Sequence, residues 1–184
     1  QVPGHHNLLN AAGVLATGLK LGFAPAELLT GLGNFRGTGR RFEVKGTVHG
    51  IRVIDDYGHH PTEIHVTLEA ARRFADAGRL IVIFQPHRYS RTQAFAQQFA
   101  KELDVADRAI LLEVYAASEK PIEGVNSKII TSKMSKGEYI PNFVEVTDSV
   151  IADAQPGDVI MTLGAGDVSS LAPIIVEGLT RRFA

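Results

Sequence analysis

The start of the chain places apolar residues at helical spacing. One helix is expected over residues 7–21, where the apolar positions that share a face are Leu8, Ala11, Ala12, Leu15 and Leu19. Gly22 ends this helix, and Pro25 begins a second one that runs to about Leu32. The Gly-rich segment 34–39 then breaks the pattern, which predicts a linker or hinge.

After the linker, short apolar runs alternate with amphipathic ones. Residues 42–49 and 51–55, joined at Gly50, predict the two strands of a hairpin. Further strands are expected over 79–84, 108–114, 143–146 and 158–163, and helices over 61–76, 90–103, 127–136, 148–154 and 169–182. These strand runs show little alternation, which is typical of strands buried on both faces. The order predicts an α/β fold with a mostly parallel sheet covered by helices.

Composition narrows the class of protein. A length of 184 residues fits one domain, or one domain plus a piece of another. Lys and Arg number 19 and Asp and Glu 20, a balance that argues against a general nucleic-acid or anionic-membrane surface. The chain has no cysteine, which excludes disulfides and thiolate metal sites and fits a reducing, cytoplasmic location. No apolar run approaches the ~20 residues that cross a bilayer. Because the chain begins at Gln1 without a Met, we expect it to be a piece of a longer one.

Arg88 and Arg91 lie where the strand over 79–84 gives way to a helix. The run Ser90-Arg91-Thr92-Gln93 matches a capping box, which predicts Ser90 as the N-cap of that helix. Arginines at a helix N-terminus oppose the helix dipole and add no helix stability there. Guanidinium groups bind carboxylate or phosphate through paired hydrogen bonds, and this edge is where open α/β sheets bind ligands. The pair predicts an anionic ligand, with two solvated surface arginines as the alternative.

A second polar segment follows the predicted hairpin. Successive side chains alternate in direction at a strand end, so only one of Asp55 and Asp56 is expected to face a cleft. His59 and His60 precede Pro61, which places His60 near the N-cap of the next helix. The roles open to the histidines are metal ligation, general base and hydrogen bonding to a ligand. Their adjacency disfavours a shared metal ion. A polar loop that only caps the helix is the rival interpretation.

Three other segments carry weaker signals. Asn7 and Asn10 share a helical face, and their amides suit a nucleobase edge, although a plain helix cap explains Asn7 equally well. Arg41, just past the linker, is placed to reach a ligand across the hinge. The turn Gly164-Ala165-Gly166-Asp167 resembles a phosphate-cradling turn, but a tight turn into the last helix explains it more simply. The P-loop pattern with its lysine is absent from the sequence.

Together these segments resemble the C-terminal part of the Mur ligase family, and most of all its L-alanine-adding member. The matching residues are His6-Asn7-x-x-Asn10-Ala11, Phe35-x-Gly37-x-x-Arg40-Arg41-Phe42-Glu43, residues 55–64, residues 84–92, Val114-Tyr115-Ala116-Ala117-x-Glu119-x-Pro121-Ile122 and Gly164-Ala165-Gly166-Asp167. They span essentially the whole chain. A recycling member that attaches a peptide shares the segment 55–64 but usually lacks 84–92, and is the close alternative. One departure is Ser118, where the family pattern has glycine.

The resemblance implies an ATP-dependent ligase of peptidoglycan synthesis that forms an amide through an acyl phosphate. Its substrates would be UDP-N-acetylmuramate, L-alanine and ATP, with Mg²⁺ held mostly by residues outside this chain. Residues 1–37 would be the tail of the central, ATP-binding domain, and residues 38–184 a Rossmann-like C-terminal domain. The partners would be the missing N-terminal and central domains. Because the P-loop is missing, we expect no ligation by the 184 residues alone.

The resemblance also implies roles for single residues. ATP binding is implied for His6, Asn7, Asn10, Arg41, Asp56 and Tyr57. L-Alanine binding is implied for His59, Arg88 and Arg91. Catalytic roles are implied for Arg41 and His59. No metal ligand, nucleic-acid contact or membrane insertion is expected of this chain. A non-catalytic α/β module that binds a nucleotide or an amino acid, and an interaction domain whose arginines bind an acidic tail, are the alternatives from other classes.

Overall fold

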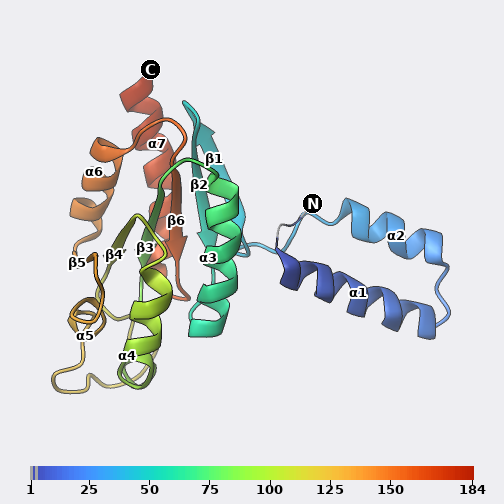
Figure 1. Ribbon diagram of the computed structural model, residues 1–184, viewed down its shortest axis with the longest axis horizontal. Coiled ribbons are helices and arrows are strands. Elements are labelled where there is room, and N and C mark those ends of the chain that lie inside the picture. Colours follow the sequence, from blue (N-terminus) through green and yellow to red (C-terminus); the bar gives the residue numbers. More distant parts are fainter. Residues whose placement is uncertain (1, 3) are drawn as a thin grey trace.

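A helical hairpin and a helix-covered sheet, which we call the sheet unit, make up the molecule (Figure 1). The computed structural model describes residue 2 and residues 4–184, and the side chain of His6 lies outside what it describes. In Figure 1 the hairpin projects from the side of the sheet unit next to β1 and α3.

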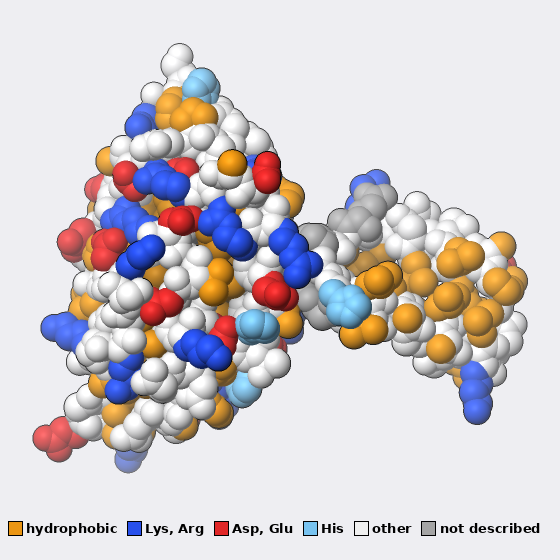
Figure 2. All heavy atoms as spheres, viewed as in Figure 1, with side chains coloured by type: hydrophobic (Ala, Val, Ile, Leu, Met, Phe, Trp, Pro, Cys, Tyr) orange, Lys and Arg blue, Asp and Glu red, His pale blue; other side chains and the backbone are white. Residues whose placement is uncertain are grey.

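The helical hairpin consists of α1 (His5–Lys20) and α2 (Pro25–Asn34), which confirms both predicted helices. Gly18 lets the two helices meet, because a Cβ at this position would lie 2.5 Å from Leu28 Cδ2. Figure 2 shows hydrophobic side chains gathered on the hairpin, whereas charged side chains are interspersed over the sheet unit. The large apolar residues exposed on the hairpin include Leu8, Leu9, Val14, Leu19, Leu21, Phe23 and Leu29.

Six strands form one mixed sheet in the order β1-β2-β6-β3-β4-β5. Their bounds are β1 Glu43–Val48, β2 Ile51–Asp56, β3 Leu80–Phe84, β4 Arg108–Leu111, β5 Gly137–Tyr139 and β6 Val159–Leu163. The β1–β2 pair is the predicted antiparallel hairpin, and all other pairs are parallel. The predicted α/β fold with a mostly parallel sheet is therefore confirmed.

Helices cover both faces of the sheet (Figure 1). One core layer packs under α3 (Pro61–Ala75), α4 (Tyr89–Leu103) and the short α5 (Lys128–Thr131), and the other under α6 (Phe143–Asp153) and α7 (Leu171–Phe183). A 3-10 turn, Asp167–Ser170, leads into α7. Within β3, Leu80, Val82 and Phe84 enter the first layer and Ile81 and Ile83 the second, so every residue of the strand is buried, as predicted. Among the described residues, no helix is both long and apolar enough to cross a membrane.

The prediction of a strand over 143–146 is wrong. These residues form the start of α6, and the edge strand β5 lies earlier, at Gly137–Tyr139. Asn142 starts the helix, because its side-chain oxygen accepts the N–H groups of Val144 and Glu145 and so caps α6. Val146 and Val150 then enter the core from one face of α6. The helix predicted over 127–136 is present but shorter, as α5.

The predicted capping box at Ser90 is also wrong. The N-cap of α4 is Arg88, whose backbone has a left-handed φ of 72° and whose side chain caps nothing. Ser90 lies inside the first turn and makes its hydrogen bonds to Glu119, from a loop beyond β4. The sequence has the local pattern of a capping box, but the carboxylate that binds Ser90 is that of Glu119, which is distant in sequence.

Candidate functional site at the carboxyl edge of the sheet

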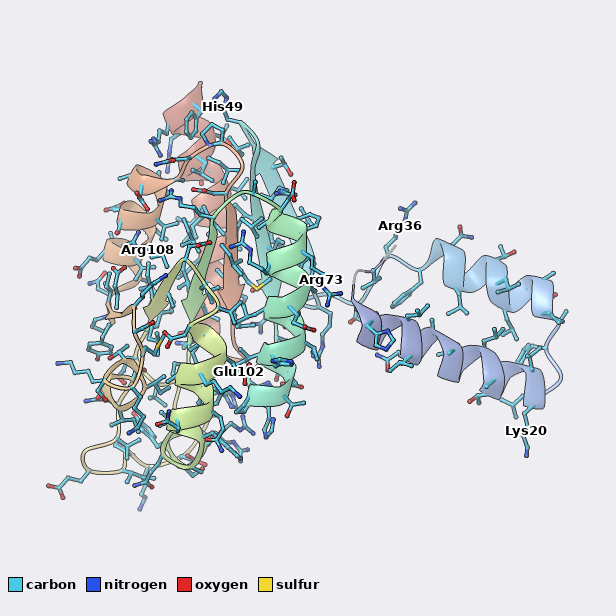
Figure 3. The ribbon with its side chains drawn as sticks, in the orientation of Figure 1. Lys20, Arg36, His49, Arg73, Glu102 and Arg108 are labelled. Carbon is cyan, nitrogen blue, oxygen red and sulfur yellow. The ribbon has the colours of Figure 1, made fainter. Side chains whose placement is uncertain are left out.

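The carboxyl ends of β2, β6 and β3 meet at one edge of the sheet. β6 comes last in the chain yet lies between β2 and β3. The loops that begin after Asp56, Phe84 and Leu163 therefore converge there, at a topological switch point of the kind where open α/β sheets bind ligands. His49, in the turn between β1 and β2, marks the opposite edge (Figure 3).

His59, His87 and Arg91 form a cluster at this edge, which we call the His–Arg cluster. The rings of His59 and His87 have centroids 5.6 Å apart, and Arg91 Nη1 lies 3.4 Å from His87 Nδ1. All three residues are partly buried. The predicted ligands His59 and Arg91 thus both lie next to one imidazole, that of His87, which the sequence reasoning did not single out. Its only signal was its place beside Arg88 in the segment 84–92.

The environment of His87 keeps its imidazole neutral. Burial lowers the pKa of His87, and the charges of Arg91, Arg88 and, when it is protonated, His59 lower it further. A guanidinium can only donate, so Nδ1 of His87 accepts from Arg91 and the proton of the neutral ring is on Nε2. The Tyr115 ring stacks on this imidazole, with ring centroids 5.6 Å apart and an angle of 16° between the ring planes. The result is a fixed N–H donor beside a guanidinium, a pairing that suits a carboxylate.

His59 and His60 have different tasks. His60 is the N-cap of α3, where its Nδ1 accepts the N–H of Thr62, and its ring packs against Phe95, so the predicted cap is confirmed. His59 Nδ1 lies 3.0 Å from the carbonyl oxygen of Tyr57 and 3.6 Å from a carboxylate oxygen of Glu63. Since a carbonyl can only accept, the proton of neutral His59 is on Nδ1, and Nε2 is left as an acceptor.

Glu63 ties this loop to α3. Its Oε2 accepts the N–H groups of both His59 and His60, at 3.0 and 3.2 Å. Burial alone would raise the pKa of Glu63, but these N–H groups and the charges of His59 and Arg41 lower it. An ionised carboxylate therefore fixes the backbone from which the His59 ring projects.

Asp55 and Asp56 are both buried in this structure, so the prediction that only one of them faces a cleft stays a prediction. Asp55 accepts from Arg40 Nε at 3.1 Å and from Thr162 Oγ1 at 2.6 Å. Asp56 accepts the N–H of Gly58 at 2.7 Å and that of Phe42 at 2.8 Å. Burial raises the pKa of Asp56 more than these N–H groups lower it. Both carboxylates hold the end of the linker on the sheet.

Arg41 is presented by this anchored backbone. Arg40 and Phe42, on either side of it, have left-handed φ values of 58° and 47°. Arg40 Nη2 also donates to the carbonyl of Gly164 at 2.6 Å, and the N–H of Tyr57 donates to the carbonyl of Arg40. The Arg41 side chain is 50% exposed, 3.9 Å from Glu63 Oε1, with Cζ 5.7 Å from the Tyr57 ring centroid. Arg41 and Tyr57 therefore lie together at the rim next to the hinge.

The turn after β6 is filled by Gln85. The Gln85 amide donates to Asp167 Oδ1 at 2.6 Å and accepts the N–H of Val168 at 3.1 Å. Gly166 packs so closely beneath it that a Cβ would lie 2.2 Å from Gln85 Oε1. These contacts favour the interpretation of Gly164–Asp167 as a tight turn over that of a phosphate cradle.

The predicted adenine-side residues lie elsewhere, on α1. Asn7 is partly buried, and Asn10 lines an open, largely apolar cavity of about 670 Å³ within the helical hairpin, together with Leu9, Val14, Leu21, Phe23 and Leu28. A cavity of about 220 Å³ separates the start of α1 from α3, where Arg73 lies on the side that faces the hairpin (Figure 3). The third predicted residue, His6, lies outside the described side chains. The structure does not bring α1 to the His–Arg cluster.

Metal-ligating side chains do not gather anywhere in the described part of the chain. Among residue 2 and residues 4–184, there is no group of three or more His, Cys, Asp or Glu that could hold a metal ion.

A family model described as Mur ligase, glutamate ligase domain, matches residues 40–166. The chain belongs to the Mur ligase family. A UDP-N-acetylmuramate–L-alanine ligase from Paenarthrobacter aurescens is 49% identical over 179 residues, covering 97% of this chain and 39% of that protein. This Mur ligase chain thus spans about two fifths of the length of the curated relatives it matches.

Solved Mur ligase structures share the fold. The crystal structure of UDP-N-acetylmuramate-alanine ligase from Thermotoga maritima matches with a TM-score of 0.82 and 32% identity, covering 98% of this chain and 39% of that one. A murein peptide ligase from Psychrobacter arcticus matches with a TM-score of 0.72 and 23% identity, covering 96% of this chain and 37% of that one. The resemblance to the Mur ligase family that the motifs predicted is confirmed.

Proposed function

We propose that this chain is the C-terminal part of an ATP-dependent ligase that joins L-alanine to UDP-N-acetylmuramate in peptidoglycan synthesis. The observation that carries the proposal is the His–Arg cluster at the switch point of the sheet, which suits a small carboxylated amine. The 49% identity to an L-alanine ligase over nearly the whole chain supports the same substrate.

The anchoring of the linker supports a division of the chain into parts of two domains. Residues 1–37 belong with a preceding ATP-binding domain, and residues 38–184 form the C-terminal domain. The exposed apolar residues of the helical hairpin support this division, as do the bonds that fix the chain to the sheet from Arg40 onward. The ligands of Mg²⁺ are expected in the preceding part, because the described residues offer no group that fits the ion.

The reaction proceeds in two steps. A carboxylate oxygen of UDP-N-acetylmuramate attacks the γ-phosphorus of ATP, so that an acyl phosphate forms and ADP leaves. The amine of L-alanine then attacks the acyl carbon, the C–N bond forms, and the C–O bond to phosphate breaks. The ammonium group of L-alanine must lose a proton before it can attack. Because the chain carries no P-loop, the first step needs the preceding domain.

The His–Arg cluster prepares L-alanine for the second step. Arg91 and the Nε2–H of His87 hold the carboxylate, and Arg88 adds a second positive charge at the start of α4. His59 Nε2 is the acceptor for the ammonium proton, since Nδ1 of this ring is occupied by the Tyr57 carbonyl. Holding the amine in one orientation converts a bimolecular encounter into a positioned attack.

The nucleotide lies on the hinge side of the same edge. Arg41 reaches the ATP phosphates, Tyr57 lies beside the nucleotide, and His6, Asn7 and Asn10 are the adenine-side contacts once the domains have closed. Asp56 was implied as the ribose contact. In this structure its carboxylate anchors the backbone on both sides of Arg41 and Tyr57, so a contact to ribose requires the anchor to open.

Replacing Arg91 with Ala in the full-length gene product tests the alanine site. Loss of a hydrogen-bonded charge pair costs about 1.5–3 kcal/mol, so the KM for L-alanine is expected to rise ~10- to 100-fold. The KM for ATP should stay within about twofold, because the nucleotide lies on the other side of the edge. Both constants are measured from L-alanine-dependent ADP release.

Arg181→Ala is the matched control, because this arginine is exposed on α7 and paired with Glu177 along the same helix face. The 184-residue chain alone is expected to release no ADP. If Arg91→Ala moved only the KM for ATP, the assignment of the pocket would be wrong. A full-length protein that used a tripeptide and not L-alanine would refute the proposed substrate.

A further inference from the structure

One carboxylate, that of Glu119, joins the loop after β4 to the first turn of α4. Its Oε2 accepts the backbone N–H of Ser90 at 3.0 Å, and its Oε1 accepts the Ser90 hydroxyl at 2.6 Å. Both oxygens of Glu119 therefore bind the same residue. Ser90 lies between the two predicted alanine-binding arginines, Arg88 and Arg91.

The first turn of α4 needs such a partner. Its N-cap, Arg88, supplies no side-chain acceptor, and the turn contains no acidic residue. Two arginines at this end oppose the positive end of the helix dipole. Glu119 provides from outside the helix both the missing acceptor and the negative charge that a helix N-terminus favours.

The backbone around the contact is held in an uncommon conformation. Arg88, Ala117 and Ser118 have φ values of 72°, 47° and 72°, in the left-handed region that favours glycine. Tyr115 pairs with the segment before α4 on both sides, since its N–H donates to the Pro86 carbonyl and its carbonyl accepts from Arg88, each at 2.8 Å. Backbone outliers of this kind persist only where the surroundings fix them, and they cluster at functional sites.

We propose that Glu119 is a positioning residue for the L-alanine site, because its carboxylate fixes the first turn of α4 and with it the directions of Arg88 and Arg91. This inference rests on the proposed function. Glu119 itself touches no reacting atom: it acts through Ser90 on the arginines, and through Arg91 on the His–Arg cluster.

The electrostatics agree with this role. The two hydrogen bonds from Ser90 lower the pKa of Glu119, and the positive charge of Arg88 lowers it further. The carboxylate is therefore ionised at neutral pH. The charge of Arg88 thus favours the ionised form of the carboxylate that binds Ser90.

The test is Glu119→Ala in the full-length gene product, with KM values for L-alanine and ATP measured separately. Loosening the arginines is expected to raise the KM for L-alanine by roughly 5- to 20-fold and to leave the KM for ATP within about twofold. Glu119→Gln keeps one acceptor for the Ser90 N–H and should recover part of the loss. Ser90→Ala removes the hydroxyl contact alone and should raise the KM for L-alanine by a smaller factor.

The double variant Ser90→Ala/Glu119→Ala should be no worse than Glu119→Ala, because both changes remove the same contact. Glu123→Ala is the matched control, an exposed glutamate in the same loop, and should leave both KM values unchanged. If Glu119→Ala does not fold, Glu119→Gln and Ser90→Ala carry the test.

Two results would overturn the inference while leaving the proposed function intact. One is an unchanged KM for L-alanine in Glu119→Ala. The other is a fall in melting temperature with equal changes in both KM values, since that is the signature of a merely structural contact. A wild-type protein without L-alanine-dependent ADP release would overturn the proposed function itself, and this inference with it.

Discussion

Single residues at the carboxyl edge carry backbone conformations that are costly for their side chains. A left-handed backbone costs an L-residue roughly 1–2 kcal/mol. Arg40 and Phe42 carry it on either side of Arg41, and Arg88 carries it at the start of α4. In each case a hydrogen bond to a neighbouring segment holds the residue: the Tyr57 N–H for Arg40, Asp56 for Phe42, and the Tyr115 carbonyl for Arg88. The strain is thus concentrated beside the predicted ligand-binding arginines.

Ser118 also has a left-handed backbone, and its side chain has no proposed role in ligand binding. It has a φ of 72°, in the left-handed region that favours glycine. Ser118→Gly removes the steric cost but adds freedom to the unfolded chain, which leaves a net stabilisation of ~0.5 kcal/mol. Urea unfolding followed by circular dichroism measures it. Ser118→Ala keeps the strain and should be nearly neutral. A glycine variant less stable than the alanine variant would contradict this account.

Sequence reasoning singled out some residues of the candidate site, but it did not predict the contacts between its loops. Arg91 was predicted as a ligand contact from residue type and place and His59 from the family resemblance, and both lie in the His–Arg cluster. His87 and Glu119 were missed as functional residues. Their importance depends on partners from other loops, Tyr115 for the first and Ser90 for the second, and no local pattern encodes such pairings.

At the scale of elements, the caps decide where the helices begin. α3 begins as predicted because Pro61, His60 and Glu63 form a self-contained local signal. α4 departs from prediction because Glu119 replaces a local cap. The helix predicted over 148–154 is present as the second half of α6, but its start was predicted as a strand because Phe143–Val146 is a short apolar run that fits either period. Elements with local signals were predictable, whereas those fixed by distant partners were not.

Asn142→Ala tests whether the cap holds α6 in place. The substitution removes the acceptor for the Val144 and Glu145 N–H groups and should lower the free energy of unfolding by about 1 kcal/mol. Asn142→Asp keeps an acceptor at the helix N-terminus and should retain most of the stability. Urea titration of the three proteins gives the comparison. Equal stability of wild type and Asn142→Ala would show that core packing of α6 alone fixes its start.

At the scale of the whole molecule, the helical hairpin and the sheet unit are stabilised separately. α2 contributes no buried residue, and neither core layer includes a described residue before Phe42. The hairpin instead exposes apolar side chains, among them Leu8 at 66% and Leu21 at 71% exposure. An apolar surface of this kind is typical of a contact with another part of a protein. The sheet unit, by contrast, begins with a firm attachment at Arg40.

This difference predicts that residues 38–184 fold without the hairpin. Removing residues 1–37 takes away no side chain of either core layer, so the free energy of unfolding of the sheet unit should change by less than about 0.5 kcal/mol. Urea unfolding of the 38–184 and 1–184 chains, followed by tyrosine fluorescence, makes the comparison.

The control chain begins at residue 43, so it lacks Arg40 and Phe42 and their bonds to Asp55 and Asp56. In that chain each buried carboxylate loses one partner, while Asp55 keeps Thr162 and Asp56 keeps Gly58, and the loss should destabilise the chain by about 1–3 kcal/mol for each carboxylate. A 38–184 chain as unstable as this control would place the hairpin in the same cooperative unit, and the proposed domain boundary would then be wrong.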